Sequence, residues 1–262
     1  MSSSLQTRAA LVTGAGSGIG RAIAVALAGA GAAVAVADLI PERAAETADL
    51  LRSQTTAPVL ALHGDVRERA VARQWVEAGH AALGRLDILV NNAGLQHVSP
   101  VQDFDEDRWD QLIGVMLTGS FLTIRYALPG MLEHGWGRII NLGSIHSLVA
   151  SRFKSAYCAA KFGVLGLTKT VALETAGTGV TVNAICPAYV RTPLIENQIP
   201  LLAARHGIPE SEVIARIVLP NCPLGRLLEP EEVAQSALYL CSDAAAGMTG
   251  TALTLDGGWT AQ

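Results

Sequence analysis

A glycine-rich turn stands between an apolar strand and a helix near the start of the chain, and this arrangement restricts the fold strongly. Residues 8–13 are mostly apolar, and an alanine-rich helix is expected over residues 21–31. The turn between them reads Thr13-Gly14-Ala15-Gly16-Ser17-Gly18-Ile19-Gly20. Glycines let the backbone approach a bound group closely, and the free amides of a helix start attract an anion. The sequence therefore predicts a site for a group such as a pyrophosphate, with an ordinary tight turn as the alternative.

The same order of strand and helix continues along the chain. Further strands are expected at residues 33–37, 59–62, 86–90, 136–142, 179–185 and 251–255, and helices at residues 41–54, 67–83, 104–133, about 155–176 and 231–241. Strands that alternate with helices form a parallel sheet joined by right-handed crossovers. We therefore expect an α/β fold, a doubly wound parallel sheet with helices on both faces. Since no linker, repeat or shift in composition divides residues 1–262, a single domain is expected.

Composition argues against several classes of partner. Hydrophobic residues make up 50% of the 262 residues, and the formal net charge is −4 without a basic cluster, so neither nucleic acid nor an anionic membrane is expected as a partner. Residues 1–8 are polar, and no run approaches the ~18 uninterrupted apolar residues of a membrane span, which favours a cytoplasmic protein. The four cysteines are scattered without metal-site spacing, so we expect no metal and interpret them as buried or unused thiols.

A tyrosine and a lysine begin one of the expected helices. Tyr157 and Lys161 are four residues apart and so lie on the same helix face. A free phenol has a pKa of about 10, and an ammonium group one turn away is expected to lower it. Tyr157 could then act as a general acid or base near neutral pH. Such a pair also occurs by chance, so this interpretation depends on the rest of the chain.

Polar residues follow the ends of several expected strands, where ligands bind in sheets of this kind. Asp38 ends the second strand at a distance from the glycine turn that suits hydrogen bonds to an adenosine ribose. Its carboxylate would repel a 2′-phosphate, and its immediate neighbours carry no positive charge, which favours NAD over NADP. An acid that caps the next helix is the alternative. Asp65, Asn92 and Gly94 lie at the ends of the third and fourth strands.

Four separated motifs occur in a fixed order along the chain. They are Thr13-Gly14-x-x-x-Gly18-x-Gly20, Asn91-Asn92-Ala93-Gly94, Ser144 with Tyr157-x-x-x-Lys161, and Pro187 with Thr192. In order and spacing they resemble the short-chain dehydrogenase/reductase family over essentially the whole chain. The resemblance implies a Rossmann-type sheet of about seven parallel strands, a nicotinamide cofactor, and hydride transfer at an alcohol or carbonyl group.

The resemblance also implies roles for individual residues. Ser144, Tyr157 and Lys161 would be catalytic: Ser144 would hydrogen-bond the substrate oxygen, Tyr157 would be the general acid/base, and Lys161 would lower the pKa of Tyr157 and hold the nicotinamide ribose. Thr192 would contact the carboxamide. Together with Tyr157 and Lys161, the residues expected to bind NAD are Gly14, Ser17, Gly18, Ile19, Gly20, Asp38, Asp65, Val66, Asn92, Ala93, Gly94, Pro187, Val190 and Thr192.

One position departs from the family pattern. Family members usually carry Asn in the middle of the long helix before the fifth strand, where it helps to hold a water that links the lysine to solvent. Met116 occupies the matching position, and a thioether cannot make the hydrogen bonds of an amide. A water or Thr118 could replace the amide, the alignment could be shifted, or proton exchange could be slower. We still expect hydride transfer.

The loops suggest a substrate. The sequences around residues 92–98, 144–151, 191–199 and 256–262 resemble those of family members that oxidise D-3-hydroxybutyrate. By this likeness Gln96, His146, Lys154 and Gln198 would bind the substrate carboxylate beside Ser144 and Tyr157, and Trp259 would wall the methyl end. Independently, Lys154 stands one turn before Tyr157 and can reach a small carboxylate, although a solvated lysine and an exposed loop histidine are plain alternatives.

Residues 191–228 are a candidate lid. The part from residue 194 to residue 228 is broken by prolines and is expected to be irregular, and a long segment of this kind beside a site often closes over ligands.

Three functions remain open from the sequence. The first is NAD-dependent oxidation of D-3-hydroxybutyrate. The second is the same chemistry on another small hydroxy acid, a polyol or a 3-oxoacyl thioester. The third is a non-catalytic NAD-binding subunit or sensor, against which Ser144, Tyr157 and Lys161 argue and which only Met116 favours. Relatives pair the helices that carry the apolar residues Leu117, Phe121, Val164 and Leu167, which suggests a homotetramer.

Overall fold

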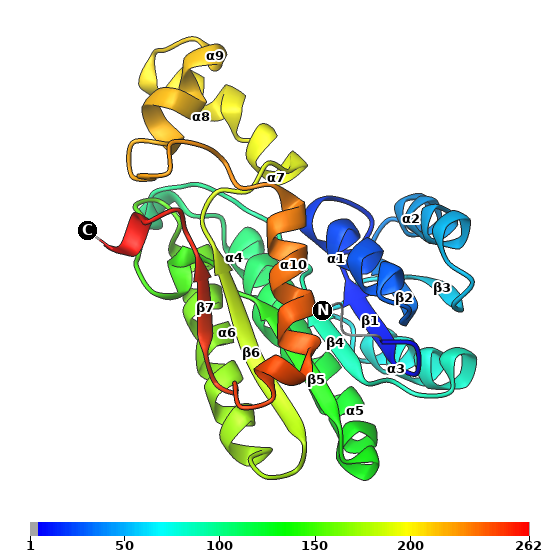
Figure 1. Cartoon of the computed structure of the whole chain (residues 1–262). Coiled ribbons are helices and arrows are strands. Elements are labelled where there is room, and N and C mark those ends of the chain that lie inside the picture. Colours follow the sequence, from blue (N-terminus) through cyan, green and yellow to red (C-terminus); the bar gives the residue numbers. More distant parts are fainter. Residues whose placement is uncertain (1–4, 262) are drawn as a thin grey trace.

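One parallel sheet of seven strands forms the centre of the computed structural model, which describes residues 5–261 (Figure 1). The strands are β1 (Ala9–Thr13), β2 (Ala33–Asp38), β3 (Val59–His63), β4 (Ile88–Asn91), β5 (Gly137–Leu142), β6 (Val180–Pro187) and β7 (Ala252–Leu255). They lie in the order β3-β2-β1-β4-β5-β6-β7, and every neighbouring pair is parallel. The expected doubly wound sheet is confirmed, and the strands differ from expectation only at their ends. Expectations for residues 1–4 and 262 lie outside the described part of the chain.

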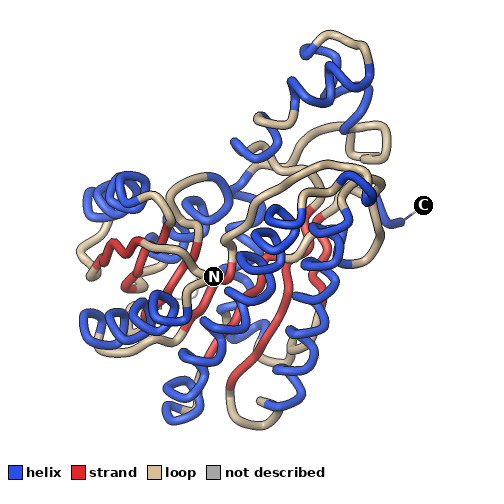
Figure 2. The backbone as a smooth tube through the Cα atoms, turned by 180° about the vertical axis from the view of Figure 1, so that it is seen from behind, coloured by secondary structure: helices blue, strands red, loops and turns tan. Residues whose placement is uncertain are grey.

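Helices cover both faces of the sheet (Figure 2). One face carries α1 (Gly18–Gly29), α2 (Pro41–Gln54) and α10 (Pro230–Cys241), and the other carries α3 (Arg69–Leu83), α4 (Glu106–Ile113), α5 (Gly119–His134) and α6 (Ser155–Glu174). A π-helical turn, η2 (Gly114–Thr118), joins α4 to α5 in one helix. By length and composition alone the helix Glu106–His134 could span a membrane, but 44% of its apolar window is buried inside the fold. Buried side chains of this helix, such as Leu112, Met116 and Leu122, belong to the core of the protein.

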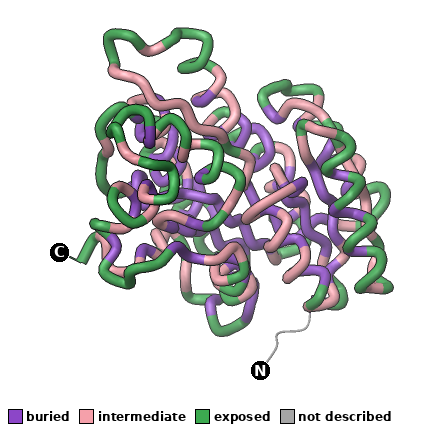
Figure 3. The backbone as a smooth tube through the Cα atoms, turned by 90° about the horizontal axis from the view of Figure 1, so that it is seen from above, coloured by how far each residue is buried: buried purple, intermediate pink, exposed green. Residues whose placement is uncertain are grey.

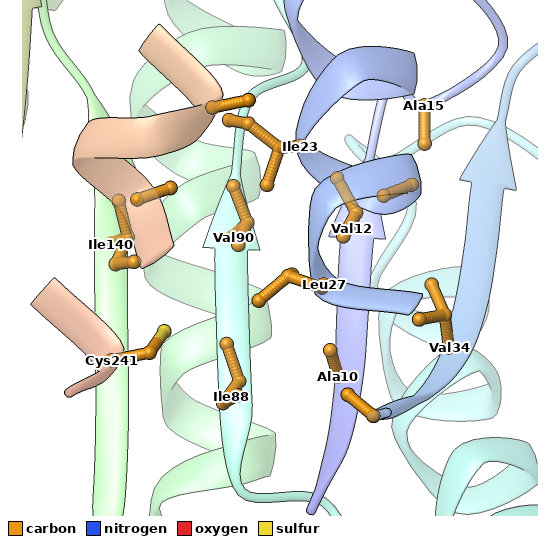
Figure 4. Packing of buried hydrophobic residues seen from close by; sticks show 14 of the residues in the cluster. Ala10, Val12, Ala15, Ile23, Leu27, Val34, Ile88, Val90, Ile140 and Cys241 are labelled. Carbon is orange, nitrogen blue, oxygen red and sulfur yellow. The ribbon is translucent and has the colours of Figure 1, made fainter. Parts of the chain in front are cut away.

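The strand side chains alternate between two hydrophobic cores. Val12 and Ile140 point to one face and join Ile23 of α1 in the core beneath α1 and α10 (Figure 4). Leu11 points to the other face and joins Trp75 of α3. Successive residues of a strand face opposite sides, so a sheet covered on both sides needs strands that are apolar throughout. Seen from above, many buried segments lie toward the middle of the molecule, and exposed segments lie largely at its outside (Figure 3).

A buried row of polar side chains ties the sheet to α5 and α6. Thr123 Oγ1 of α5 donates to Asn91 Oδ1 of β4 at 2.6 Å, and Asn91 Nδ2 donates to Asn141 Oδ1 of β5 at 2.9 Å. Asn141 Nδ2 donates in turn to Thr168 Oγ1 of α6 at 2.9 Å. A fully hydrogen-bonded polar network in a low-dielectric core favours one packing arrangement. The row therefore fixes α6, the helix of the predicted catalytic pair, relative to the strands.

The lid segment (residues 191–228) lies beyond the carboxyl ends of the strands (Figure 1). It contains α7 (Pro193–Glu196), α8 (Ile199–His206), α9 (Glu210–Val213) and the π-helical turn η4 (Ile214–Val218), which share a small apolar core. The expectation of an irregular segment was therefore wrong. Pro193 and Pro200 stand in the first turns of α7 and α8, where a missing backbone amide breaks no helical hydrogen bond. These prolines begin helices instead of ending them.

We predict that Asn141→Ala lowers the free energy of unfolding by about 2–3 kcal/mol, because it removes two hydrogen bonds and leaves the Asn91 amide unpaired in the core. Urea unfolding at a fixed protein concentration measures the change. The exposed Asn197→Ala is the matched control and should shift the free energy by less than about 0.5 kcal/mol. Equal shifts in the two variants would show that the polar row does not stabilise the fold.

Candidate active site

A cleft of about 470 Å³ opens at the carboxyl ends of the strands, beneath the lid segment. It gathers residues from segments far apart in the sequence, such as Gly14 of the glycine turn, Asp38 at the end of β2, and Tyr157 of α6. Parallel strands bring their carboxyl ends to one edge of the sheet, and ligands bind where the strand order reverses. Here that reversal lies between β1 and β4.

The predicted site residues line this cleft, with two exceptions. Gly20 lies behind the cleft wall, where a Cβ would collide with Asn92 Nδ2 and the carbonyl oxygen of Gly14. Trp259 also lies behind the wall, and its ring packs against that of Tyr189, with centroids 5.5 Å apart. Trp259 therefore supports a lining residue and is not itself among the lining residues. This differs from the expectation that Trp259 walls the methyl end of the substrate.

Asn92 holds the glycine turn against the end of β4. Its Nδ2 donates to the carbonyl oxygens of Thr13 at 2.9 Å and Gly14 at 3.0 Å, and Thr13 Oγ1 accepts from the backbone amides of Asn92 and Ala93. Gly14 and Gly18 have φ of 61° and 52°, in the left-handed region that favours glycine. A Cβ on Gly14 would lie 2.9 Å from Ala93 Cα. The turn can therefore stay this close to β4, and the start of α1 remains open to an anion.

Asp38 is held at the other end of this part of the cleft. Its Oδ2 accepts from the amide of Gly16 at 2.9 Å, and its Oδ1 accepts from the amide of Ile40 at 3.0 Å. Arg43, in the first turn of α2, also lines the cleft, and a Cβ on Gly16 would lie 2.6 Å from its Cβ. Sequence reasoning missed this cation because it considered only the immediate neighbours of Asp38. A negatively charged and a positively charged side chain therefore both line this end of the cleft.

Ser144, Tyr157 and Lys161 meet where α6 packs against the end of β5. Lys161 Nζ donates to the carbonyl oxygen of Leu142 at 2.5 Å and lies 5.6 Å from the centre of the Tyr157 ring. Ser144 follows β5 by one short turn, and its Oγ accepts from the amide of His146 at 3.1 Å. The three side chains therefore face the same part of the cleft, as the motif predicts.

The protonation of this group differs from the expectation. Burial raises the pKa of Tyr157 to about 12, although a hydrogen bond with Ser144 opposes the rise. Burial also lowers the pKa of Lys161 to about 8. Loss of hydration disfavours the phenolate and the ammonium alike, and it is the largest cause of both shifts. Tyr157 is therefore a neutral proton donor in this state, and additional positive charge in the cleft is needed before it becomes a base.

Lys154 presents a buried ammonium group to the cleft. It is 9% exposed, and its Nζ lies 5.4 Å from the centre of the Tyr189 ring. Burial lowers the pKa of Lys154. Within residues 5–261, no acidic side chain forms an ion pair with it. A buried charge without a partner is costly, so an anionic ligand in the cleft would be stabilised here.

His146 lines the cleft as a neutral ring. Burial, and secondarily the charge of Lys154, lowers its pKa to about 4. Its Nδ1 lies 3.1 Å from the carbonyl oxygen of Val149. A carbonyl can only accept, so Nδ1 carries the proton and Nε2 is left as an acceptor. His146 therefore cannot donate to a carboxylate through Nε2 without taking up a further proton.

The two glutamines predicted to bind substrate also line the cleft, but each already uses part of its amide. Gln96 Oε1 accepts from the amide of His97 at 3.0 Å, which leaves its Nε2 for a ligand. Gln198 Nε2 donates to the carbonyl oxygen of Leu194 at 2.7 Å within the lid segment. Gln198 would have to release or share this hydrogen bond to contact a carboxylate.

Met116 packs into the core beside the cleft. It is 1% exposed and clusters with Leu112 of α4 and Ala160 of α6. Thr118 is exposed, so it does not replace the missing amide. The ammonium group of Lys161 is held by its hydrogen bond to the carbonyl oxygen of Leu142. The sequence departure thus coincides with a purely apolar contact.

The cysteines take no visible part in the site chemistry. Cys158, Cys186, Cys222 and Cys241 are all free and buried. Across residues 5–261, the structure contains no group of three His, Cys, Asp or Glu side chains that could hold a metal ion.

Comparison with known proteins identifies the family. A family model described as "Enoyl-(Acyl carrier protein) reductase" matches residues 14–260. The chain is 49% identical to "D-beta-hydroxybutyrate dehydrogenase" of Rhizobium meliloti (strain 1021), over 85% of this chain and 86% of that protein. It is 48% identical to a protein of the same name from Cupriavidus necator, over 76% of this chain and 78% of that protein.

A solved structure agrees with this result. The short-chain type dehydrogenase/reductase from Mycobacterium marinum superimposes with a TM-score of 0.90 at 33% identity, covering 100% of this chain and 98% of that one. Since a family model, sequence relatives and a solved structure each match most of its length, the chain is an oxidoreductase of the short-chain dehydrogenase/reductase family.

Proposed function

We propose that the protein oxidises D-3-hydroxybutyrate to acetoacetate, reversibly, with NAD as the hydride acceptor. The observation that carries this proposal is the buried ammonium of Lys154, which has no acidic partner among residues 5–261, in the same cleft as Ser144 and Tyr157. A small hydroxy acid can place its hydroxyl group on Tyr157 and its carboxylate on Lys154. The names of the two relatives at 49% and 48% identity support the same substrate.

The residues present fit a nicotinamide dinucleotide. The glycine turn and the start of α1 offer amides to its pyrophosphate, and Asp38 can accept from ribose hydroxyls. At the end of β6, Thr192 would contact the carboxamide, beside Pro187 and Val190. The remaining residues proposed for this role are Asp65, Val66, Asn92, Ala93 and Gly94, which also line the cleft. When bound, NAD supplies the ring that accepts the hydride.

Tyr157 moves the proton in this proposal. Oxidation starts once Tyr157 has lost its own proton. Its phenolate oxygen then takes the proton of the substrate hydroxyl while the hydride leaves the carbon that bears this hydroxyl, and Ser144 orients the substrate oxygen. The raised pKa of about 12 suits the reverse direction, in which Tyr157 donates. Lys161, with a pKa of about 8, is mostly protonated at neutral pH and lies near the phenol. Its positive charge favours the phenolate in the forward direction.

We also propose that the protein acts in the cytoplasm as a homotetramer. An apolar groove between α5 and α6 is lined by Phe121, Leu128, Leu132 and Leu167, among others, and Phe121 is 45% exposed. A second copy of this chain would cover the groove. Val164, expected on this face from the sequence, is buried inside the subunit, so it does not contribute.

A purified-protein assay tests the function. D-3-hydroxybutyrate, its L-enantiomer and a 3-hydroxyacyl thioester are supplied separately with NAD and with NADP, and cofactor reduction is followed by absorbance. Fast turnover of the D-acid with NAD alone is expected. Activity restricted to the thioester would favour the second candidate, which is supported by a relative named "Acetoacetyl-CoA reductase" at 41% identity over 68% of this chain. NAD binding without any turnover would indicate a non-catalytic subunit.

Replacing Tyr157 by Phe should reduce turnover by about 10²–10⁴-fold, because the proton then has no acceptor. Titration should show that NAD still binds. Tyr239→Phe is the control, since Tyr239 is exposed on α10, and it should keep full activity. A Tyr157→Phe variant with normal turnover would refute the proposed role.

Replacing Asp38 by Ala should raise kcat/KM for NADP relative to NAD by about tenfold or more, because the repulsion of the 2′-phosphate is removed. Arg43 would then be free to pair with that phosphate. The double variant Asp38→Ala/Arg43→Ala should lose most of the gain. An unchanged NADP to NAD ratio in the single variant would count against the ribose contact.

Replacing Lys154 by Ala should raise KM for D-3-hydroxybutyrate by about 10–100-fold, because a charge-assisted contact is lost. The effect on kcat and on KM for NAD should be much smaller. Lys169→Ala, on the exposed side of the same helix, is the control and should leave both constants unchanged. An unaltered KM for the acid in Lys154→Ala would remove this lysine from the substrate site.

A further inference from the structure

A lid arginine lies over an aromatic ring that is next in sequence to a cleft residue. The guanidinium carbon of Arg205, in α8, is 3.8 Å from the centre of the Phe153 ring. This is close cation–π geometry. Phe153 stands directly before Lys154, the residue whose buried ammonium lines the cleft. The contact therefore joins the lid to the loop that presents Lys154.

The backbone at Phe153 is unusual. Its φ is 66°, and within residues 5–261 it is the one residue other than glycine with positive φ. This region is disfavoured for a bulky side chain, and it persists only where neighbouring contacts impose it. One such contact is the hydrogen bond from the amide of Ser99 to the carbonyl of Phe153, at 2.9 Å.

This conformation sends neighbouring side chains in opposite directions. Phe153 is 41% exposed and faces Arg205, whereas Lys154 is 9% exposed and lines the cleft. Ser99 pairs with Lys154 in a short parallel bridge, and the loop that leads to Ser99 carries Gln96. The loop after β4 and the loop before α6 thus form one unit with Lys154 at its centre.

The lid carries the remaining predicted carboxylate ligand on the same helix as the arginine. Gln198 is the residue that precedes α8, and Arg205 lies in its last turn. At the base of the lid, the amide of Arg191 donates to the carbonyl of Leu228, and the amide of Leu228 donates to the carbonyl of Tyr189. The lid is therefore joined to the body at its base and again at Arg205, with Gln198 between these two points.

We propose that Arg205 is a positioning residue that holds the lid closed over the cleft by stacking on Phe153. Closure brings Gln198 of the lid to the side of the cleft where Lys154 is proposed to bind the substrate carboxylate. The role in substrate binding rests on the proposed function, but closure itself does not depend on the identity of the substrate. An exposed cation–π contact favours the closed state by only about 2–5-fold, so the lid still opens for ligand exchange.

Hydrogen–deuterium exchange of the full-length protein without substrate tests closure directly. Arg205→Met keeps the aliphatic stem and removes the cation. Phe153→Asn removes the ring while tolerating positive φ. Each variant should speed amide exchange in residues 193–206 by about 2–5-fold, and the double variant should exchange no faster than either single variant.

The controls separate the stack from general effects. Arg216→Met removes another lid arginine, one that pairs with Glu212, and should leave exchange in residues 193–206 unchanged. Phe153→Tyr keeps the ring and should exchange at the wild-type rate. Unchanged exchange in Arg205→Met and Phe153→Asn, or effects that add in the double variant, would overturn the proposal that stacking of Arg205 on Phe153 holds the lid closed. This holds whatever substrate the enzyme uses.

Kinetics give the second measurement. With D-3-hydroxybutyrate as substrate, Arg205→Met should raise KM for the acid by about 2–5-fold, and KM for NAD should stay at the wild-type value. Arg205→Lys keeps a cation and should recover part of the loss. Faster exchange with an unchanged KM would overturn the proposed effect on substrate binding, and a lack of any turnover by the wild-type enzyme would instead contradict the proposed function.

Discussion

The hydrogen bond from Lys161 to the carbonyl of Leu142 is the contact on which the site depends. It reaches from α6 to the end of β5, and Ser144 lies two residues beyond that end. The buried hydrogen bond between Asn141 and Thr168 joins the same two elements. The helix that carries Tyr157 is thereby fixed against the strand that presents Ser144. Catalytic groups on two separate elements can keep one geometry only if those elements cannot slide.

Burial controls the charge in this cleft as much as the pairing of groups does. Lys154 and Lys161 are both buried there, and their lowered pKa values arise from lost hydration. The raised pKa of Tyr157 has the same cause. At the far end, Asp38 stands beside Arg43. The cleft is thus cationic where a small carboxylate is proposed to bind and mixed in charge where the ribose is proposed to bind.

Much of the fold could be predicted from the sequence, because it follows from local pattern. Apolar strands, the glycine turn and the residues at strand ends have fixed spacings, and those spacings place Tyr157 at the sheet edge. Arg43 was missed because it is distant from Gly16 in the sequence and comes close to it only in the folded chain. The neutrality of His146 could not be predicted either, since it depends on burial and on the nearby Lys154. Lid prolines such as Pro200 were interpreted as breakers, although a proline in the first turn starts a helix.

Direct transfer of hydrogen from substrate to cofactor is the central claim, and isotope labelling tests it. The enzyme would be incubated with NAD and D-3-hydroxybutyrate carrying deuterium at the carbinol carbon. The mass of the reduced cofactor would then be measured by mass spectrometry. The account predicts one deuterium in each NADH formed and none from solvent deuterium. Reduced cofactor without the label, or no reduction while NAD is bound, would contradict it.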